Sequence, residues 1–482
     1  MSSAQHVTAP KDRISWPHRV AYGAGAFVNN LLAAASGGMM IVLNLGFGMD
    51  PALVGLLGAL PRITDAFTDP VVGYISDHAR TAWGRRRPFI FWGAIVSGLL
   101  FILLWQIPSG LSEAGIFVWF LVGSILFYLA YTVFATPWVA LGFELTPDYN
   151  ERTRLMGTAN FTGQLAYVVS PWFLWIMTYE GFFETQAEGA AGLAILVALV
   201  VMGVGILPAI FLREPLQRVA VAEAGAPRGG LLANLKAFFR AFGTVLQSKP
   251  FRLLCAATFL VFNGFILISS FQFYVIIYYV FGGDQAAGAE YAGYAGTVGA
   301  VATFAIVVFT TWLGTKIGKR RAFMISTGLS VVGYALKWFA YNPEMPWLVV
   351  LPAPLMAFGL GGLFTLVPSM IADVVDLDEL TSHERREGMF GSIYWWVVKL
   401  GLAAALAAGG VLLNATGFDV ELGGAQTERA LFLLRVFDVA VPAVTSALAI
   451  WAIARFPITE ETAREVREEL ERRRGAADLG AA

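Results

Sequence analysis

Long apolar segments limit most strongly how this chain can fold. Of its 482 residues, 57% are hydrophobic and only 14% are charged, which is more apolar surface than a water-soluble domain can cover. A helix needs about 20 apolar residues to cross the hydrocarbon core of a bilayer. The sequence therefore predicts an all-α membrane protein with twelve transmembrane helices. The predicted spans are residues 19–46, 53–76, 88–107, 115–143, 155–178, 191–212, 251–281, 291–314, 322–341, 347–371, 388–414 and 430–455.

Charged residues alternate between the loops that join these spans. Most of the 33 Lys and Arg residues fall at the chain ends and in every second loop. The other loops carry acidic residues such as Glu113, Glu180 and Asp284, and Arg429 and Arg435 are the exceptions. Because cytoplasmic loops hold the excess of basic residues, both termini are expected on the cytoplasmic side of the cell (inner) membrane. This placement requires an even number of spans.

A weak repeat divides the chain into two halves. The segment Gly84–Phe89 after the second span resembles Gly318–Phe323 after the eighth, and Glu151-Arg152 is repeated as Glu384-Arg385 at the same spacing to within one residue. Parallel six-helix halves with a solute site between them are typical of the major facilitator superfamily. We predict an N-terminal half at residues 1–212, a linker at 213–250, a C-terminal half at 251–455 and a cytoplasmic tail at 456–482.

The linker and the tail have their own patterns. Between residues 231 and 246, apolar residues alternate with basic ones at helical spacing, which favours an amphipathic helix on the cytoplasmic leaflet. A flexible linker is the alternative. Residues 459–474 are highly charged and are expected to form a solvated helix.

Ionisable residues inside two spans indicate a cation site. Asp65 and Asp69 are four residues apart in the second span, so they lie on one helix face, and Thr68 falls beside them. Such groups cost a few kcal/mol or more in the hydrocarbon region and usually face a water-filled cavity. Carboxylate and hydroxyl oxygens suit Na⁺, Li⁺ or a proton, and if the coupling ion is Na⁺ we expect Asp65 and Asp69 to hold it. Lys399 in the eleventh span could balance their charge; a fixed salt bridge is the alternative.

Further charges lie at the cytoplasmic ends of the spans. We expect these to form contacts between helices that close one end in one state, and not to bind solute. Lys337 and Asp438 are isolated in the ninth and twelfth spans, where pairing or snorkelling is expected. The predicted gating residues are Asp77, Arg85, Arg86, Arg87, Asp373, Asp376, Arg385 and Arg386.

Polar and aromatic side chains recur at helical spacing on several spans. They could stack on and hydrogen-bond a polyol, although helix packing is the alternative for each. The chain has no Walker sequence, no histidine cluster among its four His and no nucleophile elbow, so we predict neither an enzyme nor a cofactor other than the coupling ion. The candidate solute contacts are Asn30, Arg62, Tyr128, Tyr131, Thr132, Trp138, Asn160, Gln164, Asn263, Trp395 and Trp396.

The motif around the carboxylates resembles a known family. PRITDAFTDPVVG at residues 61–73, followed by WGRRRP at 83–88, is similar to the glycoside–pentoside–hexuronide:cation symporters of the major facilitator superfamily, whose best-known member is melibiose permease. Residues 22–27 and 373–399 resemble it too, so the similarity covers nearly the whole chain. The resemblance implies that Asp65 and Asp69 bind the coupling cation and that Lys399 belongs to the same cluster.

The chain departs from the melibiose permease pattern at the sugar site. Asn30 and Ala135 stand where that pattern has aspartates, and Asn160 stands where it has an arginine. Trp395 replaces a threonine near the cation, which leaves Na⁺ and H⁺ both open. These departures imply a different solute, while the cation machinery is kept.

The sequence thus predicts a cation-coupled (Na⁺ or H⁺) secondary transporter that imports a sugar or glycoside by alternating access. We expect a monomer in the lipid bilayer, with a small solute as partner and no nucleic acid. One alternative is a carrier of an amphiphilic, lysolipid-like or other non-sugar solute. A second is a membrane sensor that does not transport.

Overall fold

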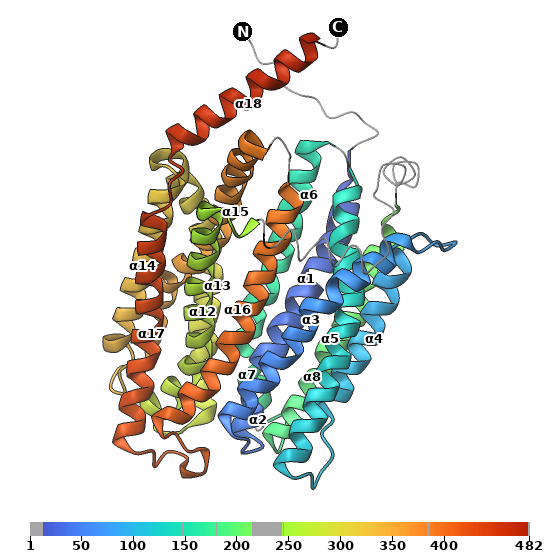
Figure 1. Cartoon of the computed structure of the whole chain (residues 1–482). Helices are drawn as coiled ribbons and strands as arrows, with labels where there is room; N and C mark the ends of the chain where they lie inside the picture. Colours follow the sequence, from blue (N-terminus) through green and yellow to red (C-terminus); the bar gives the residue numbers. More distant parts are fainter. Residues whose placement is uncertain are drawn as a thin grey trace. The chain divides into compact units, whose positions relative to one another are not determined.

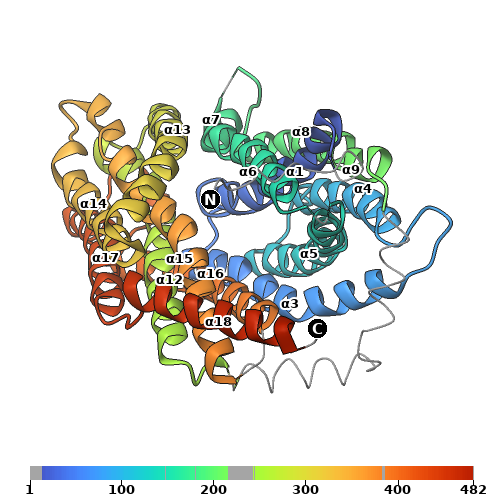
Figure 2. The same cartoon turned by 90° about the horizontal axis from the view of Figure 1, so that it is seen from above.

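The chain is almost entirely helical. The computed structural model describes residues 13–146, 148–179, 181–214, 243, 245–382 and 386–480, which contain no strand. The chain divides into two compact units, Met1–Leu232 and Ala233–Ala482. This boundary falls within the predicted linker, but residues 215–242, with most of the predicted amphipathic helix, lie outside the described residues. Each unit is a bundle of long helices (Figure 1, Figure 2).

Unit 1 runs from the first to the sixth predicted span. Three of its spans, the first, fifth and sixth, are interrupted near their ends, where one or two short helices continue the long one. Its helices are α1 (Trp16–Gly38), α2 (Ile41–Leu45), α3 (Pro51–His78), α4 (Arg87–Trp105), α5 (Glu113–Glu144), α6 (Tyr149–Val169), η2 (Ser170–Trp172), α7 (Phe173–Thr178), α8 (Gln186–Gly205) and α9 (Leu207–Phe211). Within it α1 packs on α6, α3 on α5, and α4 on both α5 and α8.

Unit 2 contains the last six predicted spans and the tail. Its helices are α12 (Lys249–Tyr274), η3 (Val275–Val280), α13 (Gln285–Ile317), α14 (Lys319–Ala340), η4 (Pro346–Val350), α15 (Ala353–Ser382), α16 (Glu387–Thr416), η5 (Val420–Leu422), α17 (Glu428–Ala454) and α18 (Glu460–Gly480). Within this unit α12 packs on α17 and α16, α14 on α15 and α17, and α13 on α15.

Ten helical segments in the described residues are long and apolar enough to cross a membrane. Two of the predicted spans are not among them: α3, and the continuous run from α6 to α7. The middle of α3 carries Arg62, Asp65 and Asp69, and α6 begins with the polar sequence YNERTR. Polar residues lower the mean hydropathy of both segments without shortening them. The helix count is therefore consistent with the predicted twelve.

Local sequence defines where α3 begins and where its regularity weakens. Asp50 caps it by accepting the backbone N–H of Ala52 at 2.8 Å, and Pro51 occupies its first position, which suits a residue without an N–H. Pro61 and Pro70 lie inside the helix, and each removes one backbone hydrogen bond. The two carboxylates lie between these prolines.

The tail is helical, as predicted, but its expected solvation is wrong for one face. Val466 and Leu470 of α18 are only 6% and 5% exposed, and they lie four residues apart on the side of α18 that packs on α15. Arg473 also donates to the carbonyl oxygen of Leu380 at 3.1 Å, in the last turn of α15. These two apolar residues and the Arg473 contact join α18 to the bundle, although its other faces are charged.

Close packing of α4 on α5 depends on a glycine. A Cβ atom on Gly93 would lie 2.5 Å from the backbone nitrogen of Phe134 and 2.8 Å from its Cα. Because those are main-chain atoms of a helix, no rotamer change can relieve the overlap.

We expect Gly93→Ala to push α4 and α5 apart and to cost about 1–3 kcal/mol, seen as a lower unfolding temperature of the purified protein in detergent. Gly203→Ala on α8 is the matched control, since a Cβ there meets nothing within 4 Å and alanine favours the helix. Equal unfolding temperatures for the two variants would contradict the expected close contact.

Candidate cation and solute site

Two carboxylates from α3 and one hydroxyl from α5 converge at one point. The Thr132 hydroxyl oxygen lies 2.7 Å from Oδ1 of Asp65 and 3.1 Å from Oδ1 of Asp69. Asp65 and Thr132 are 2% and 1% exposed. One hydroxyl has a single proton to donate, so it cannot satisfy both carboxylates at once. A proton or a small cation at this point would stabilise the close approach of the Thr132 hydroxyl to the Asp69 carboxylate.

This oxygen set differs from the set that the sequence predicted. The hydroxyl of Thr68, a predicted cation ligand, donates instead to the backbone carbonyl of Asp65 at 3.3 Å. Thr132, which the sequence placed among the solute contacts, supplies the hydroxyl between the carboxylates. Its position could not be found from spacing, because it comes from another helix more than sixty residues away.

Arg62 lies one turn before Asp65 on α3. Its guanidinium carbon is 4.3 Å from the ring centroid of Tyr128, a cation–π distance, and its buried Nε has no hydrogen-bond partner among the described residues. A guanidinium, a phenol ring and two carboxylates therefore occupy neighbouring turns of α3 and α5.

A polar chain continues from this point toward α1 and α6. The hydroxyl of Tyr131 donates to Oδ1 of Asn29 at 2.7 Å, and the Asn29 amide donates to Oδ1 of Asn30 at 3.2 Å. A Cβ atom on Gly163 of α6 would lie 2.7 Å from the Asn30 amide nitrogen. Unit 1 thus brings Asn30, Tyr131 and the Arg62–Tyr128 pair into one polar region.

The other predicted solute contacts of unit 1 are Trp138, Asn160 and Gln164. Trp138 is 6% exposed, stacks on Tyr22 at 5.1 Å and donates its indole N–H to the Tyr22 carbonyl at 3.1 Å. It therefore packs α5 on α1, the alternative role open to each aromatic residue. On α6, Asn160 is exposed and Gln164 is partly buried.

The remaining candidates belong to unit 2. Lys399 and Trp396 are partly buried on α16, and Trp395, 53% exposed, lies parallel to Phe364 at 6.2 Å. Asn263 of α12 is 7% exposed, and its amide donates to the Phe259 carbonyl at 2.6 Å. A Cβ atom on Gly401 would lie 2.8 Å from that amide nitrogen, so Asn263 sits where α12 meets α16.

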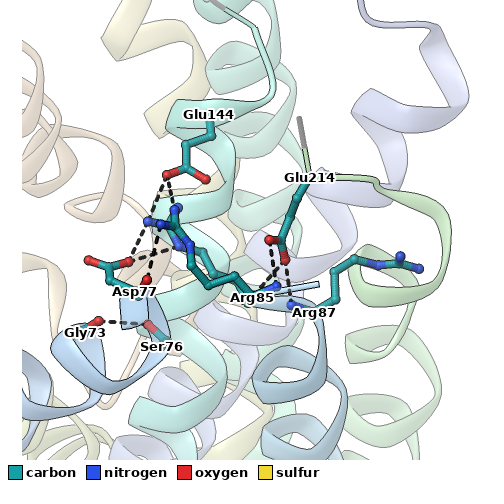
Figure 3. A network of polar contacts seen from close by, with 8 residues as sticks. Gly73, Ser76, Asp77, Arg85, Arg87, Glu144 and Glu214 are labelled. Carbon is teal, nitrogen blue, oxygen red and sulfur yellow. Dashed lines mark hydrogen bonds and ion pairs between the residues drawn. The ribbon is translucent and has the colours of Figure 1, made fainter. Parts of the chain in front are cut away.

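The predicted gating residues of unit 1 form a connected network (Figure 3). Arg86 binds Asp77 at 2.7 Å and Glu144 at 3.0 Å, and Arg85 binds the same Glu144 oxygen at 2.7 Å. These contacts join the end of α3, the start of α4 and the end of α5. The sequence did not single out Glu144, because nothing in its local surroundings distinguishes it from a solvated acid at a helix end.

A second carboxylate, from Glu214, caps the start of α4. It accepts the backbone N–H groups of Arg85, Arg86 and Arg87 at 2.8, 2.7 and 3.1 Å (Figure 3). An acid at a helix N-terminus meets unpaired N–H groups and the positive end of the helix dipole. Gly84 has φ +116°, and a Cβ there would lie 2.9 Å from the Glu214 carboxylate, so this turn requires glycine.

Unit 2 has a smaller network at the corresponding position. Lys319 lies 2.7 Å from both oxygens of Asp373, and Arg386 lies 3.3 Å from Asp378. Asp376 is partly buried, whereas the predicted Arg385 lies outside the described residues.

The pairing expected for Lys337 and Asp438 is confirmed. The Lys337 ammonium lies 2.6 Å from both carboxylate oxygens of Asp438, and the two side chains are 0% and 1% exposed. This ion pair joins α14 to α17 inside unit 2, where snorkelling to the membrane surface is not possible.

The ligand chemistry limits the ions that the α3–α5 site could hold. Across the ranges that the structure describes, no group of three or more His, Cys, Asp or Glu side chains is placed to bind a metal ion. Two carboxylates and one hydroxyl suit a small monovalent cation or a proton.

Comparisons with known proteins place the chain in a family. A family profile described as "MFS/sugar transport protein" matches residues 21–460. The isoprimeverose transporter of Lactiplantibacillus pentosus is 27% identical over 465 residues, which cover 95% of this chain and 93% of that protein. The sodium-dependent lysophosphatidylcholine symporter 1 of Mus musculus is 24% identical over 488 residues, which cover 96% of this chain and 89% of that protein.

A solved structure shares the fold. The inward-facing, unoccupied crystal structure of a bacterial homolog to the human lysosomal transporter Spinster has a TM-score of 0.64 and 16% identity, and covers 92% of this chain and 98% of that chain. The predicted major facilitator fold is therefore confirmed, and so is the family resemblance of the α3 motif. The chain belongs to the MFS/sugar transport protein family, the glycoside–pentoside–hexuronide group, and is a membrane-embedded transporter and not an enzyme.

Proposed function

We propose that the protein is a cation-coupled symporter that imports a sugar or glycoside across the cell (inner) membrane, with both termini in the cytoplasm. The family description and the relatives' names support the class of activity. The observation that carries the coupling is the convergence of Asp65, Asp69 and Thr132. Like charges this close in a buried site repel each other, and a bound cation or proton offsets that repulsion.

Coupling follows from where the cation binds. The carboxylates of the cation site and Arg62 share one face of α3, within two turns, so filling the site changes the electrostatic field at the polar region of unit 1. A membrane potential of 100 mV supplies about 2.3 kcal/mol for each charge that enters. Lys399 stays our predicted counter-charge for the empty carboxylates. No cofactor beyond the coupling ion, Na⁺ or H⁺, is proposed.

The solute side of the proposal rests on hydrogen-bonding groups. Asn30, Tyr131 and Arg62 present amide, phenol and guanidinium groups, and Tyr128 adds a ring face. These groups suit the hydroxyls and the apolar ring faces of a sugar. An amphiphile is the second candidate solute, because a lysophosphatidylcholine symporter matches 96% of the chain. The family description favours sugar.

Uptake by the purified protein in proteoliposomes tests the proposal. We expect a sugar or glycoside from an oligosaccharide panel to accumulate under a Na⁺ or a pH gradient, and Asp65→Asn or Asp69→Asn to abolish accumulation. A lysophospholipid in the same panel tests the alternative. Accumulation of the lysophospholipid and of no sugar would overturn the sugar assignment, and absence of any coupled flux would favour a sensor that does not transport.

The role of the Thr132 hydroxyl as a cation ligand can be tested separately. We expect Thr132→Val to raise the half-saturating cation concentration at least about tenfold, since one hydrogen bond to a charged group contributes about 1.5–3 kcal/mol. Thr68→Val, whose hydroxyl bonds to its own helix, is expected to change it less than about threefold. A larger effect at Thr68 than at Thr132 would reverse the assignment of the hydroxyl ligand.

For the network at the end of α3 we propose a gating role on the cytoplasmic side. Glu144→Gln removes the charge that both arginines share and is expected to lower the maximal uptake rate by about threefold to tenfold, as partly exposed pairs contribute up to about 1 kcal/mol each. The half-saturating cation concentration should not change. Glu184→Gln, at an exposed position, is the control; a matching loss there would remove the gating role.

A further inference from the structure

The end of α12 has an unusual backbone. The six residues that directly follow α12, Val275–Val280, form the π-helix η3, and the N–H of Phe281 donates to the carbonyl of Ile276, five residues earlier, at 3.1 Å. π-Helices are rare and short. Such a segment persists only where the surrounding contacts hold it in place. The first four residues of η3, Val275 to Tyr278, are almost fully buried, at 0–2% exposure.

Apolar and backbone contacts surround this segment on three sides. Ile277 packs so closely on α13 that a Cβ atom on Gly288 would lie 2.6 Å from it. Tyr278 contacts Phe418, in the loop before α17, with ring centroids 4.8 Å apart. The backbone of Gly283 lies against that of Gly424, since a Cβ on Gly283 would be 2.6 Å from the Gly424 Cα.

A charged side chain holds the remaining side. The guanidinium carbon of Arg435, on α17, is 4.0 Å from the ring centroid of Tyr279 and 4.3 Å from that of Trp338. Its Nη2 donates to the Trp338 carbonyl at 2.8 Å. That carbonyl belongs to the last turn of α14, where carbonyls have no partner within the helix and the dipole is negative. One guanidinium therefore connects η3, α14 and α17.

The buried ion pair lies next to this contact. Lys337 precedes Trp338 on α14, and Asp438 follows Arg435 by three residues on α17. The Lys337 ammonium also lies 5.0 Å from the ring centroid of Tyr341. Sliding α14 along α17 would separate two buried charges, which is strongly unfavourable. The pair thus fixes the register of the two helices that carry the Arg435 contact.

We propose that Arg435 is a positioning residue, which holds the π-helical end of α12 to the frame formed by α14 and α17. Without the guanidinium, Tyr279 loses its cation–π partner, and the local contacts no longer determine the π-helical register. The role also accounts for a basic residue in a segment where acidic residues prevail. It goes beyond the proposed transport function and does not depend on it, because it concerns the local stability of one segment.

Hydrogen–deuterium exchange of the full-length protein in nanodiscs tests this role without solute or gradient. We expect Arg435→Gln to speed amide exchange in residues 275–283 by about tenfold, while residues 251–270 of the same helix keep their rates. Arg435→Lys should recover part of the protection, because an ammonium retains a cation–π contact but not the planar stack. Arg429→Gln, at an exposed position in the first turn of α17, is the matched control.

Unchanged exchange in residues 275–283 of the Arg435→Gln protein would overturn the proposal. Faster exchange spread evenly over unit 2 would overturn it as well, since Arg435 would then stabilise the whole unit. If Arg435→Gln does not fold, Tyr279→Leu removes the stacked ring and leaves the charges of α17 in place; the same local increase is expected, and its absence refutes the role. Failure of coupled uptake in proteoliposomes would leave this result unaffected.

Discussion

The structure depends on how charges are accommodated in an apolar interior. A carboxylate in hydrocarbon costs a few kcal/mol or more, yet α3 carries Asp65 and Asp69 one turn apart. Both carboxylates lie within hydrogen-bond distance of the hydroxyl of Thr132. Two carboxylates and one hydroxyl oxygen therefore lie together at this site. Like charges this close favour the binding of a cation or a proton, and they make α3 more polar than an ordinary membrane span.

Three other charged side chains in the spans have partners within unit 2. Lys337 and Asp438 form a buried ion pair, and the guanidinium of Arg435 contacts two aromatic rings and donates to a carbonyl. Each of these charges already has a partner of opposite charge or an aromatic and carbonyl partner, and such contacts fix the register and position of the helices. These charges serve the fold, whereas Asp65 and Asp69 are the proposed ligands of the coupling cation. The contrast explains why isolated ionisable residues in a membrane sequence need not mark a transport site.

Much of the candidate site was predictable, and the failures have a common cause. Helical spacing placed Asp65 and Asp69 on one face, and the motif at residues 61–73 indicated the family. Spacing indicates Thr68, the near neighbour, as a hydroxyl ligand and cannot indicate Thr132, because spacing reports only on residues of the same helix. Glu144 and Glu214 were missed because their partners come from distant segments. The buried face of α18 was missed because two apolar residues in a charged helix give a weak signal.

The sequence by itself determined the all-helical membrane fold, the order of the helices and the two carboxylates on one face, because these depend on composition and on the helical repeat. Only the tertiary structure decided which hydroxyl joins the carboxylates, which acid binds Arg85 and Arg86, and how α12 ends in a π-helix held by Arg435. The physical reason is that contacts between helices depend on their rotation and approach. Those are set by packing at glycines such as Gly93 and Gly288, and no single helix encodes them.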